Sequence, residues 1–376
     1  MIKMRVDAEF DYASGYSTVA RNFVERIHEK HTDKIDLNIS RMNNPQYLKI
    51  DWMHGVTEKK DITQKVDHAL MWTTPNTRVA YMKEPNAFPM WKDTKSFHYF
   101  VWELNKIPQL WSTLLEDIKT DAIFTASNFS KDAIEASVDL PVHVVPHGFD
   151  NKTYRKKDKI KKRSKFVALY VGSWDKRKAP LETVLSMVNA LHGTDSEIWI
   201  KINYDEQTTK QLKRSIQTSV VRSFPNMKNI PKIYIFNNYM TEKEMNNMYN
   251  KADIVVSASR GEAWNMPLFE AIATKTPVIT TDKGGHMDYI NKNYTFLSKT
   301  RGLTLSAGDG VYDSNNGLKW LDVDFEHTSR LLKDAYDLWL SDKEKLDEHA
   351  EILYQNIKHL TWDNAIDIYL NHVSQY

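Results

Sequence analysis

The sequence has 376 residues, of which 41% are hydrophobic and 27% are charged, and it contains no cysteine. This composition is typical of globular proteins, and the length favours two domains of ordinary size over one. Without cysteine the chain forms no disulfide, thiolate metal site or cysteine nucleophile. Its apolar runs fall short of the roughly 18 residues that a membrane span needs. We expect a cytoplasmic protein, with peripheral attachment to a membrane as the alternative.

Short β-type runs alternate with helical stretches through the first 150 residues. The runs expected to form strands are 2–7, 35–40, 69–73, 78–82, 97–102, 122–126 and 143–145. Such alternation indicates a parallel sheet covered by helices.

The second half repeats this pattern. Its β-type runs are 166–171, 198–202, 233–236, 254–257 and 278–281. Most intervals leave room for a crossover helix, so a second α/β unit is predicted. Residues 325–376 have apolar side chains at helical spacing, and we expect this stretch to pack on both domains.

A strongly basic segment separates the two sets of strands. Residues 152–165 hold nine Lys or Arg and one Asp, a local charge of +8, which leaves −6 for the rest of a chain whose formal net charge is +2. The segment lacks apolar periodicity, which favours a domain boundary near 150–165. It is either a solvated linker or a contact for an anionic surface, nucleic acid or membrane.

The most informative motif is Ser257 to Ala271, in which a glycine-containing loop joins a β-type run to a helix that begins near Pro267. The N-terminus of such a helix presents backbone N–H groups to an anion beyond the strand end. Glu262 and Glu270 bracket the turn, and carboxylates accept hydrogen bonds from the vicinal hydroxyls of a ribose or a hexose. The alternative is that both acids only complement the helix dipole.

A second motif, Tyr170 to Pro180, combines a β-type run with a turn that contains Lys176, Arg177 and Lys178. Paired cations after a strand suit a diphosphate, because Arg grips it in a bidentate manner and Lys adds a point charge. Solvated surface cations are the alternative. Spacing alone leaves open which of the three side chains points inward.

These motifs resemble glycosyltransferase family 4 and its retaining GT-B relatives, whose signature S-R-x-E-G-F-G-L-P-x-x-E-A has seven residues between two glutamates. The residues that fall on this signature are Glu262, Pro267, Glu270 and Ala271, with Met266 in place of its leucine. The basic turn resembles the family's R-K-G element, and Thr276 to Ile279 matches the end of its G-T-P-V-I.

The resemblance implies an α/β fold of the GT-B type: two Rossmann-like doubly wound domains facing a cleft, with a C-terminal helix that crosses back to the N-terminal domain. We expect residues 1–155, with a helix at about 360–376, to form an acceptor-binding domain. Residues 165–359 are then the nucleotide-sugar-binding domain.

The resemblance also implies roles for individual residues. Glu262 would contact the donor sugar and Glu270 the ribose, while Lys178 would bind the diphosphate with Arg177 as its helper. Further donor-binding residues are then Gly172, Asn265, Met266 and Pro267. The residues that stand where the family commonly has glycine are Ala179, Ala263, Asn265 and Lys275.

The first half matches the family more weakly. Gly15 lies in a loop similar to the family's first-strand loop and is assigned to the donor site. His98 and Glu103 lie in a segment where the family has a cleft-facing His or Glu, and we assign both to catalysis together with Arg177, Lys178 and Glu262. A histidine satisfied in the core is the alternative for His98. Residues 144–150 match the family's V-P-N-G-V-D exit from the first domain.

The implied activity is transfer of a hexose-type sugar, with retention, from a UDP- or GDP-linked donor to an acceptor hydroxyl. A sugar-nucleotide epimerase, a phosphorylase and an inactive nucleotide-sugar-binding protein are alternatives on the same architecture. The acceptor stays open among carbohydrate, protein and anionic classes such as modified nucleic acid, lipid-linked sugar or polysaccharide.

No cofactor is expected, because the sugar nucleotide is a substrate, and no metal site is predicted. The histidines lack zinc spacing. The sequence Asp322-Val323-Asp324 resembles a metal motif of another glycosyltransferase architecture, but we do not expect it to end a strand.

Overall fold

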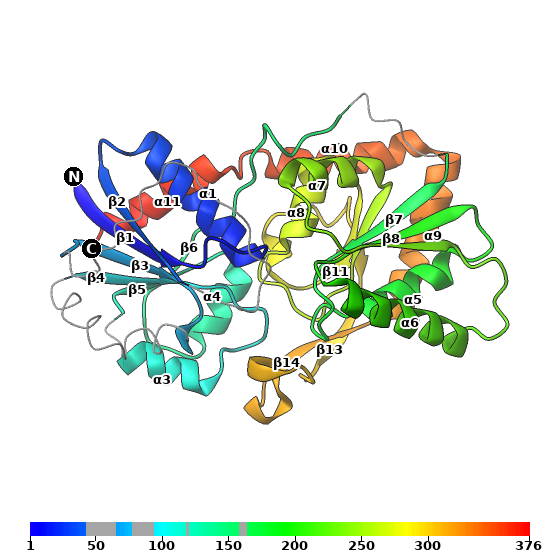
Figure 1. Cartoon of the computed structure of the whole chain (residues 1–376), viewed down its shortest axis with the longest axis horizontal. Helices are drawn as coiled ribbons and strands as arrows, with labels where there is room; N and C mark the ends of the chain where they lie inside the picture. Colours follow the sequence, from blue (N-terminus) through cyan, green and yellow to red (C-terminus); the bar gives the residue numbers. More distant parts are fainter. Residues whose placement is uncertain (43–64, 77–93, 118–119, 158–163) are drawn as a thin grey trace. The chain divides into compact units, whose positions relative to one another are not determined.

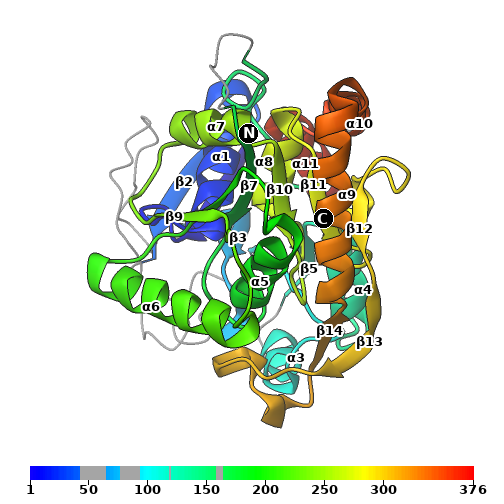
Figure 2. The same ribbon diagram turned by 90° about the vertical axis from the view of Figure 1, so that its right-hand side faces the viewer.

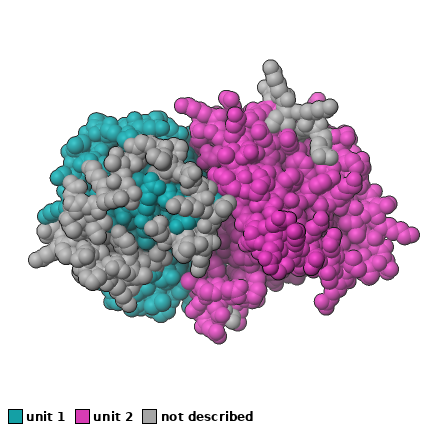
Figure 3. Space-filling model, in the orientation of Figure 1, with its two compact units in different colours: residues 1–148, 360–376 teal, residues 149–359 magenta. Residues whose placement is uncertain are grey.

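The computed structural model describes residues 1–42, 65–76, 94–117, 120–157 and 164–376. They form two compact units: unit 1 comprises 1–148 and 360–376, and unit 2 comprises 149–359 (Figure 3). The strand expected at 78–82 lies outside the described residues. Across the described part of the chain, no helix has the length and apolar character that crossing a membrane requires.

A six-stranded parallel sheet, in the order β2-β1-β3-β4-β5-β6, forms the centre of unit 1 (Figure 1). The strands are β1 (Ile2–Ala8), β2 (Ile35–Arg41), β3 (His68–Trp72), β4 (Lys95–Tyr99), β5 (Ala122–Thr125) and β6 (Val142–Val144). All residues of β3 and β5 are buried. Burial on both faces is typical of a parallel sheet covered by helices.

The described helices of unit 1 are α1 (Gly15–Lys30), α3 (Gln109–Asp117), α4 (Asn128–Glu135) and α11 (Trp362–Val373). Helix α11 packs against α1. Its Tyr369 ring lies 4.9 Å from the rings of both Phe23 and Phe124. The C-terminal helix therefore belongs to the N-terminal unit, which confirms this part of the expected fold.

Unit 2 contains a second six-stranded parallel sheet, in the order β12-β11-β10-β7-β8-β9. Its strands are β7 (Phe166–Val171), β8 (Ser196–Lys201), β9 (Lys232–Phe236), β10 (Ile254–Ser257), β11 (Val278–Thr281) and β12 (Phe296–Ser298). Counted from β7, this is the doubly wound order 3-2-1-4-5-6. The chain direction across the sheet reverses between β7 and β10, where ligands of such folds bind.

The α-helices of unit 2 are α5 (Pro180–Leu191), α6 (Glu206–Ser223), α7 (Glu242–Lys251), α8 (Met266–Ala273), α9 (Phe325–Ser341) and α10 (Lys343–Ile357). Helices α5, α6 and α9 share one apolar core with the sheet, through residues such as Val184, Ile216 and Leu332. Figure 2 shows α5 and α9 side by side. Helices α7 and α10 contact α8.

Several sequence expectations need correction. The run expected at 97–102 ends as a strand at Tyr99, because the backbone of Trp102 bonds the Ser130 hydroxyl through both its N–H and its C=O. Strand β12 was not predicted, nor was the antiparallel pair β13 (Thr300–Leu305) and β14 (Lys319–Val323). Asp322 lies in β14, so the expectation that 322–324 does not end a strand was wrong. Asp324 instead caps α9.

The described part of the basic segment is attached to α7. The backbone N–H groups of Arg155 and Lys157 donate to the side chains of Asn246 and Asn250 at 3.1 and 2.8 Å. The ammonium of Lys157 also reaches Asn247 at 2.6 Å. Residues 155–157 are therefore held on unit 2 and do not form a free linker.

Gly148 lies where no larger residue fits. A Cβ atom at this position would approach the backbone N of Trp362 to 2.2 Å and the carbonyl carbon of Thr361 to 2.4 Å. We expect Gly148→Ala to destabilise unit 1 by about 3 kcal/mol, because the backbone at the start of α11 would have to shift to relieve the steric clash. Differential scanning calorimetry should show a melting temperature lower by roughly 6–12 °C.

Gly15→Ala is the matched control in the same unit. A Cβ atom there meets nothing within 4 Å, and the residue begins α1. Alanine in a helix should change stability by less than about 1 kcal/mol. Equal melting temperatures for the two variants would contradict the close approach at Gly148.

Candidate functional site

Two loops of unit 2 follow neighbouring parallel strands and meet at one edge of the sheet. Residues 172–179 join β7 to α5, and residues 258–265 join β10 to α8. Strands β7 and β10 are paired, with Ile254 opposite Ala168. The loops are themselves joined, since the N–H of Arg260 donates to the carbonyl of Arg177 at 2.8 Å. Both motifs found in the sequence thus lie at the point where the strand order reverses.

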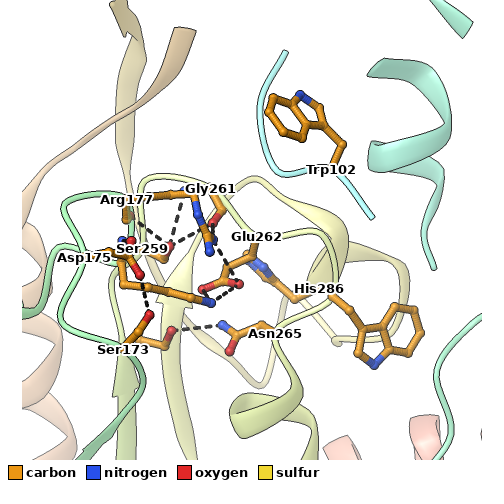
Figure 4. A network of polar contacts seen from close by, with 12 residues as sticks. Trp102, Ser173, Asp175, Arg177, Ser259, Gly261, Glu262, Asn265 and His286 are labelled. Carbon is orange, nitrogen blue, oxygen red and sulfur yellow. Dashed lines mark hydrogen bonds and ion pairs between the residues drawn. The ribbon is translucent and has the colours of Figure 1, made fainter. Parts of the chain in front are cut away.

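An ion pair between Lys178 and Glu262 forms the centre of this site (Figure 4). The Lys178 ammonium donates to both carboxylate oxygens, at 2.7 and 2.6 Å. The Glu262 side chain is only 4% exposed and that of Lys178 19% exposed. Of the three basic residues in the turn, Lys178 therefore points to Glu262, whereas the Lys176 side chain is 63% exposed.

The guanidinium of Arg177 also lies near the Glu262 carboxylate. One of its terminal nitrogens donates to the Gly261 carbonyl at 2.7 Å and lies 3.8 Å from Glu262. Its guanidinium carbon lies 5.3 Å from the centroid of the Tyr312 ring. Both cations of the predicted diphosphate site are thus oriented by residues of the β10–α8 loop.

Asp175 adds a second carboxylate to the network (Figure 4). It accepts from the backbone N–H of Lys178 at 3.0 Å and from the Ser173 hydroxyl. Burial alone would raise the pKa of Asp175, but Arg177, the Ser173 hydrogen bond and Lys178 together lower it. Asp175 is therefore ionised near neutral pH. Its negative charge and that of Glu262 balance the positive charges of Lys178 and Arg177. Asp175 was not among the site residues predicted from the sequence.

Three residues that stand where the resembling family commonly has glycine adopt a left-handed backbone conformation. The φ angles are 48° at Ala179, 69° at Asn265 and 54° at Lys275. Residues other than glycine are uncommon in this region, and Asn tolerates it best. The side chain of Asn265 also donates to the Ser257 hydroxyl at 2.9 Å, which fixes the turn into α8.

The N-termini of α5 and α8 carry no side-chain cap among the described residues. Ala179 and Asn265 hold the cap positions, and neither side chain accepts a hydrogen bond from the helix. Pro180 and Pro267 lie in the first turns. These ends present backbone N–H groups and a positive dipole to the site, which is the usual device for binding phosphate. Met266 is the first residue of α8.

Glu270 lies one turn into α8, apart from the ion pair. Its carboxyl accepts from the Tyr249 hydroxyl at 2.8 Å, and Tyr154 is a second hydrogen-bond partner. Burial raises the pKa of Glu270 to about 8, although both tyrosines act in the opposite direction. The carboxyl is thus largely protonated at neutral pH and can both donate and accept.

A third loop, which follows β11, contacts the backbone of Glu262. The N–H of Gly285 donates to the Glu262 carbonyl at 2.7 Å. His286 is fully buried, and burial lowers its pKa, so its neutral ring donates from Nε2 to the Thr281 carbonyl at 2.8 Å. Gly284 has a φ of 129°, and a Cβ there would meet the His286 ring at 2.8 Å. The loop is therefore packed tightly onto Glu262.

The remaining predicted residues lie outside the ion-pair network, with Gly172 at the start of the β7–α5 loop. Gly172 directly follows β7, where its N–H donates to the Lys201 carbonyl at 3.2 Å. His98 is buried in β4 of unit 1, and its Nε2 donates to the Thr73 carbonyl at 2.6 Å. Glu103 follows β4 and is partly buried, and Gly15 begins α1. The unit 2 network forms without His98, Glu103 and Gly15, whose assigned roles stay predictions.

Within the described ranges, no group of three or more His, Asp or Glu side chains is arranged to hold a metal ion.

Comparison with known proteins gives a family match for the part of the chain that contains this site. Residues 150–303 match the family of group 1 glycosyl transferases. A putative glycosyltransferase of Bacillus subtilis strain 168, YtcC, is 27% identical over 199 residues, which is 50% of this chain and 46% of the relative. The match therefore spans less than half the length of that relative.

Solved structures match the whole chain. Anabaena Alr3699/HepE in complex with UDP and glucose has a TM-score of 0.69 and 11% identity, with 100% of each chain covered. A glycosyltransferase from Rickettsia africae ESF-5 has a TM-score of 0.67 and 16% identity, covering 100% of this chain and 98% of its own. Sucrose-phosphate synthase from Thermosynechococcus elongatus has a TM-score of 0.67 and 12% identity, covering 100% and 99%. The chain thus has the GT-B fold, and residues 150–303, which hold both site loops, match the group 1 glycosyl transferases.

Proposed function

We propose that this protein is a group 1 glycosyltransferase that moves a hexose from a UDP- or GDP-linked donor to an acceptor hydroxyl with retention of configuration. The observation that carries the proposal is the Lys178–Glu262 pair around a buried carboxylate, with Arg177 beside it and two helix N-termini without side-chain caps around it. The match of residues 150–303 and the fold shared with a protein solved in complex with UDP and glucose support it.

The ion pair suggests how the free site is kept ready for a donor. A diphosphate that enters beside Lys178 competes with Glu262 for the ammonium, and a released Glu262 can accept hydrogen bonds from the sugar hydroxyls. In the reaction, the bond from the anomeric carbon to the phosphate oxygen breaks as the bond to the acceptor oxygen forms. Lys178, Arg177 and the helix N-termini stabilise the charge that develops on the leaving diphosphate.

Retention rests on the family resemblance. The leaving phosphate takes the acceptor proton on the same face of the sugar, so no protein nucleophile is needed. Glu270, held between Tyr249 and Tyr154, is assigned to the ribose because a protonated carboxyl can donate to one hydroxyl and accept from the other. The catalytic roles proposed for His98 and Glu103 rest on the family resemblance alone.

Thermal stability measured with a panel of nucleoside diphosphates and their sugars tests the proposal. A ligand of the folded state raises the melting temperature, and about 2.7 kcal/mol is gained at 100 times its Kd. We expect a shift with uridine or guanosine nucleotides, followed by release of the diphosphate when an acceptor is present. Binding without turnover would indicate an inactive sugar-nucleotide protein, and no shift with any nucleotide would contradict the proposal.

Lys178→Ala should lower kcat/KM roughly 10²–10³-fold, because the leaving diphosphate loses its main cation. Release of nucleoside diphosphate measures the effect. Lys176→Ala is the matched control from the same turn, since its side chain is 63% exposed and its nearest carboxylate, Asp309, is 3.9 Å away. It should stay within about twofold of the unmodified protein. Near-normal turnover of the Lys178 variant would remove this residue from the mechanism.

Glu270→Gln tests the raised pKa through its effect on stability. Because the folded-state pKa is about 8 and the ordinary value is 4.5, the folded protein binds this proton more tightly than the unfolded chain. The stabilisation is complete below pH 4.5 and is lost as pH rises toward 8. The melting temperature of the unmodified protein, relative to the variant, should therefore fall between about pH 5 and about pH 8.

Glu206→Gln provides the control for this measurement, because that side chain is 79% exposed on α6. Its melting temperature relative to the unmodified protein should not change over the same pH interval. A Glu270→Gln difference that is likewise constant would show that Glu270 ionises normally.

A further inference from the structure

The ribbon formed by β13, β14 and their connecting loop, residues 300–323, is a distinct part of unit 2 (Figure 1). The match to the group 1 family ends at residue 303, so nearly all of the ribbon lies beyond it. The connecting loop contains two short 3-10 helices, Gly310–Tyr312 and Ser314–Asn316. No role was assigned to this ribbon from the sequence.

The base of the ribbon is fastened to the β10–α8 loop. The N–H of Leu321 donates to the Arg260 carbonyl at 2.8 Å. The Arg260 guanidinium lies over the Trp320 ring at 5.5 Å, and Leu321 packs with Ala258 in a buried cluster. The ribbon is thus attached one residue before the Gly261–Glu262 pair of the site.

The tip of the ribbon reaches the other site loop. The N–H of Tyr312 donates to the Asp309 carbonyl at 3.2 Å, and a Cβ on Gly308 would meet the Cβ of Tyr312 at 2.6 Å, so this turn is compact. From this turn the Tyr312 ring lies 5.3 Å from the guanidinium carbon of Arg177. Asp309 lies 3.9 Å from Lys176 in the same basic turn.

We propose that Tyr312 is a positioning residue that holds the Arg177 guanidinium in place for the donor diphosphate. The inference rests on the proposed function. The Arg177 guanidinium donates to the Gly261 carbonyl at 2.7 Å and has a longer contact of 3.8 Å to Glu262. The face of an aromatic ring attracts a guanidinium. The ring thereby restricts the rotamers of Arg177 before the ligand binds, so that less side-chain entropy is lost on binding. The ring acts through Arg177 and need not touch the donor.

Two substitutions of Tyr312 distinguish its aromatic contact with Arg177 from apolar packing. Tyr312→Phe keeps the aromatic face, and Tyr312→Leu keeps an apolar side chain without it. We expect Tyr312→Leu to weaken nucleoside diphosphate binding and to lower kcat/KM for the donor by roughly tenfold, which corresponds to about 1.4 kcal/mol. Tyr312→Phe should stay within about twofold. Titration calorimetry with UDP and GDP and steady-state kinetics measure both, and melting temperatures verify folding.

A double-mutant cycle tests whether the effect passes through Arg177. In an Arg177→Met background, Tyr312→Leu should cause no further loss, because the cation that the ring positions is absent. An undiminished tenfold loss in that background would overturn the proposal and indicate direct contact between Tyr312 and the ligand. If Tyr312→Leu fails to fold, Tyr312→Met is used in the same cycle.

The outcomes for the two proposals are separable. Nucleotide binding by the unmodified protein together with an unchanged Tyr312→Leu variant would overturn the role of Tyr312 and leave the proposed function standing. Absence of nucleotide binding by the unmodified protein would remove the proposed function, and the role of Tyr312 with it.

Discussion

The partly buried ion pair between Lys178 and Glu262 is the contact on which the rest of the site depends. Removing two charges from water costs several kcal/mol for each ion, and only close, well-directed contacts offset that cost. Here the ammonium meets both carboxylate oxygens at 2.6 and 2.7 Å. Each loop therefore needs the other, because loss of one partner would leave an uncompensated buried charge. Gly285 and Arg177 extend this dependence to a third loop and a second cation.

Residues with a left-handed backbone lie in both site loops and in the turn that follows α8, and this conformation costs free energy. Ala179, Asn265 and Lys275 have positive φ where the resembling family commonly has glycine. A left-handed alanine or lysine costs roughly 1–2 kcal/mol, so the surrounding contacts must hold these turns in place. Burial of Ala179 and the hydrogen bond from Asn265 to Ser257 are such contacts. The left-handed turns at these positions thus form without glycine.

The match to the group 1 family includes the two site loops but ends near the start of the ribbon. In unit 2, both site loops fall within the matched residues 150–303, and the pairing of β7 with β10 brings them together. The ribbon at 300–323 lies almost entirely beyond that match, yet it contacts both loops through Arg260 and Arg177. The residues within the match and the ribbon beyond it therefore both contribute to one site.

The sequence by itself determined the α/β alternation, the positions of strands such as β7, β10 and β11, and the motif residues, because these depend on local periodicity and loop composition. It did not reveal the ribbon, whose first strand is exposed and interrupted by glycine. Only the tertiary structure decided that Lys178 rather than Lys176 points to Glu262, and that Tyr312 covers Arg177. Lys178 and Glu262 are 84 residues apart in the chain. Such contacts arise where strand pairing brings separate loops together, and no local pattern records which side chains then meet.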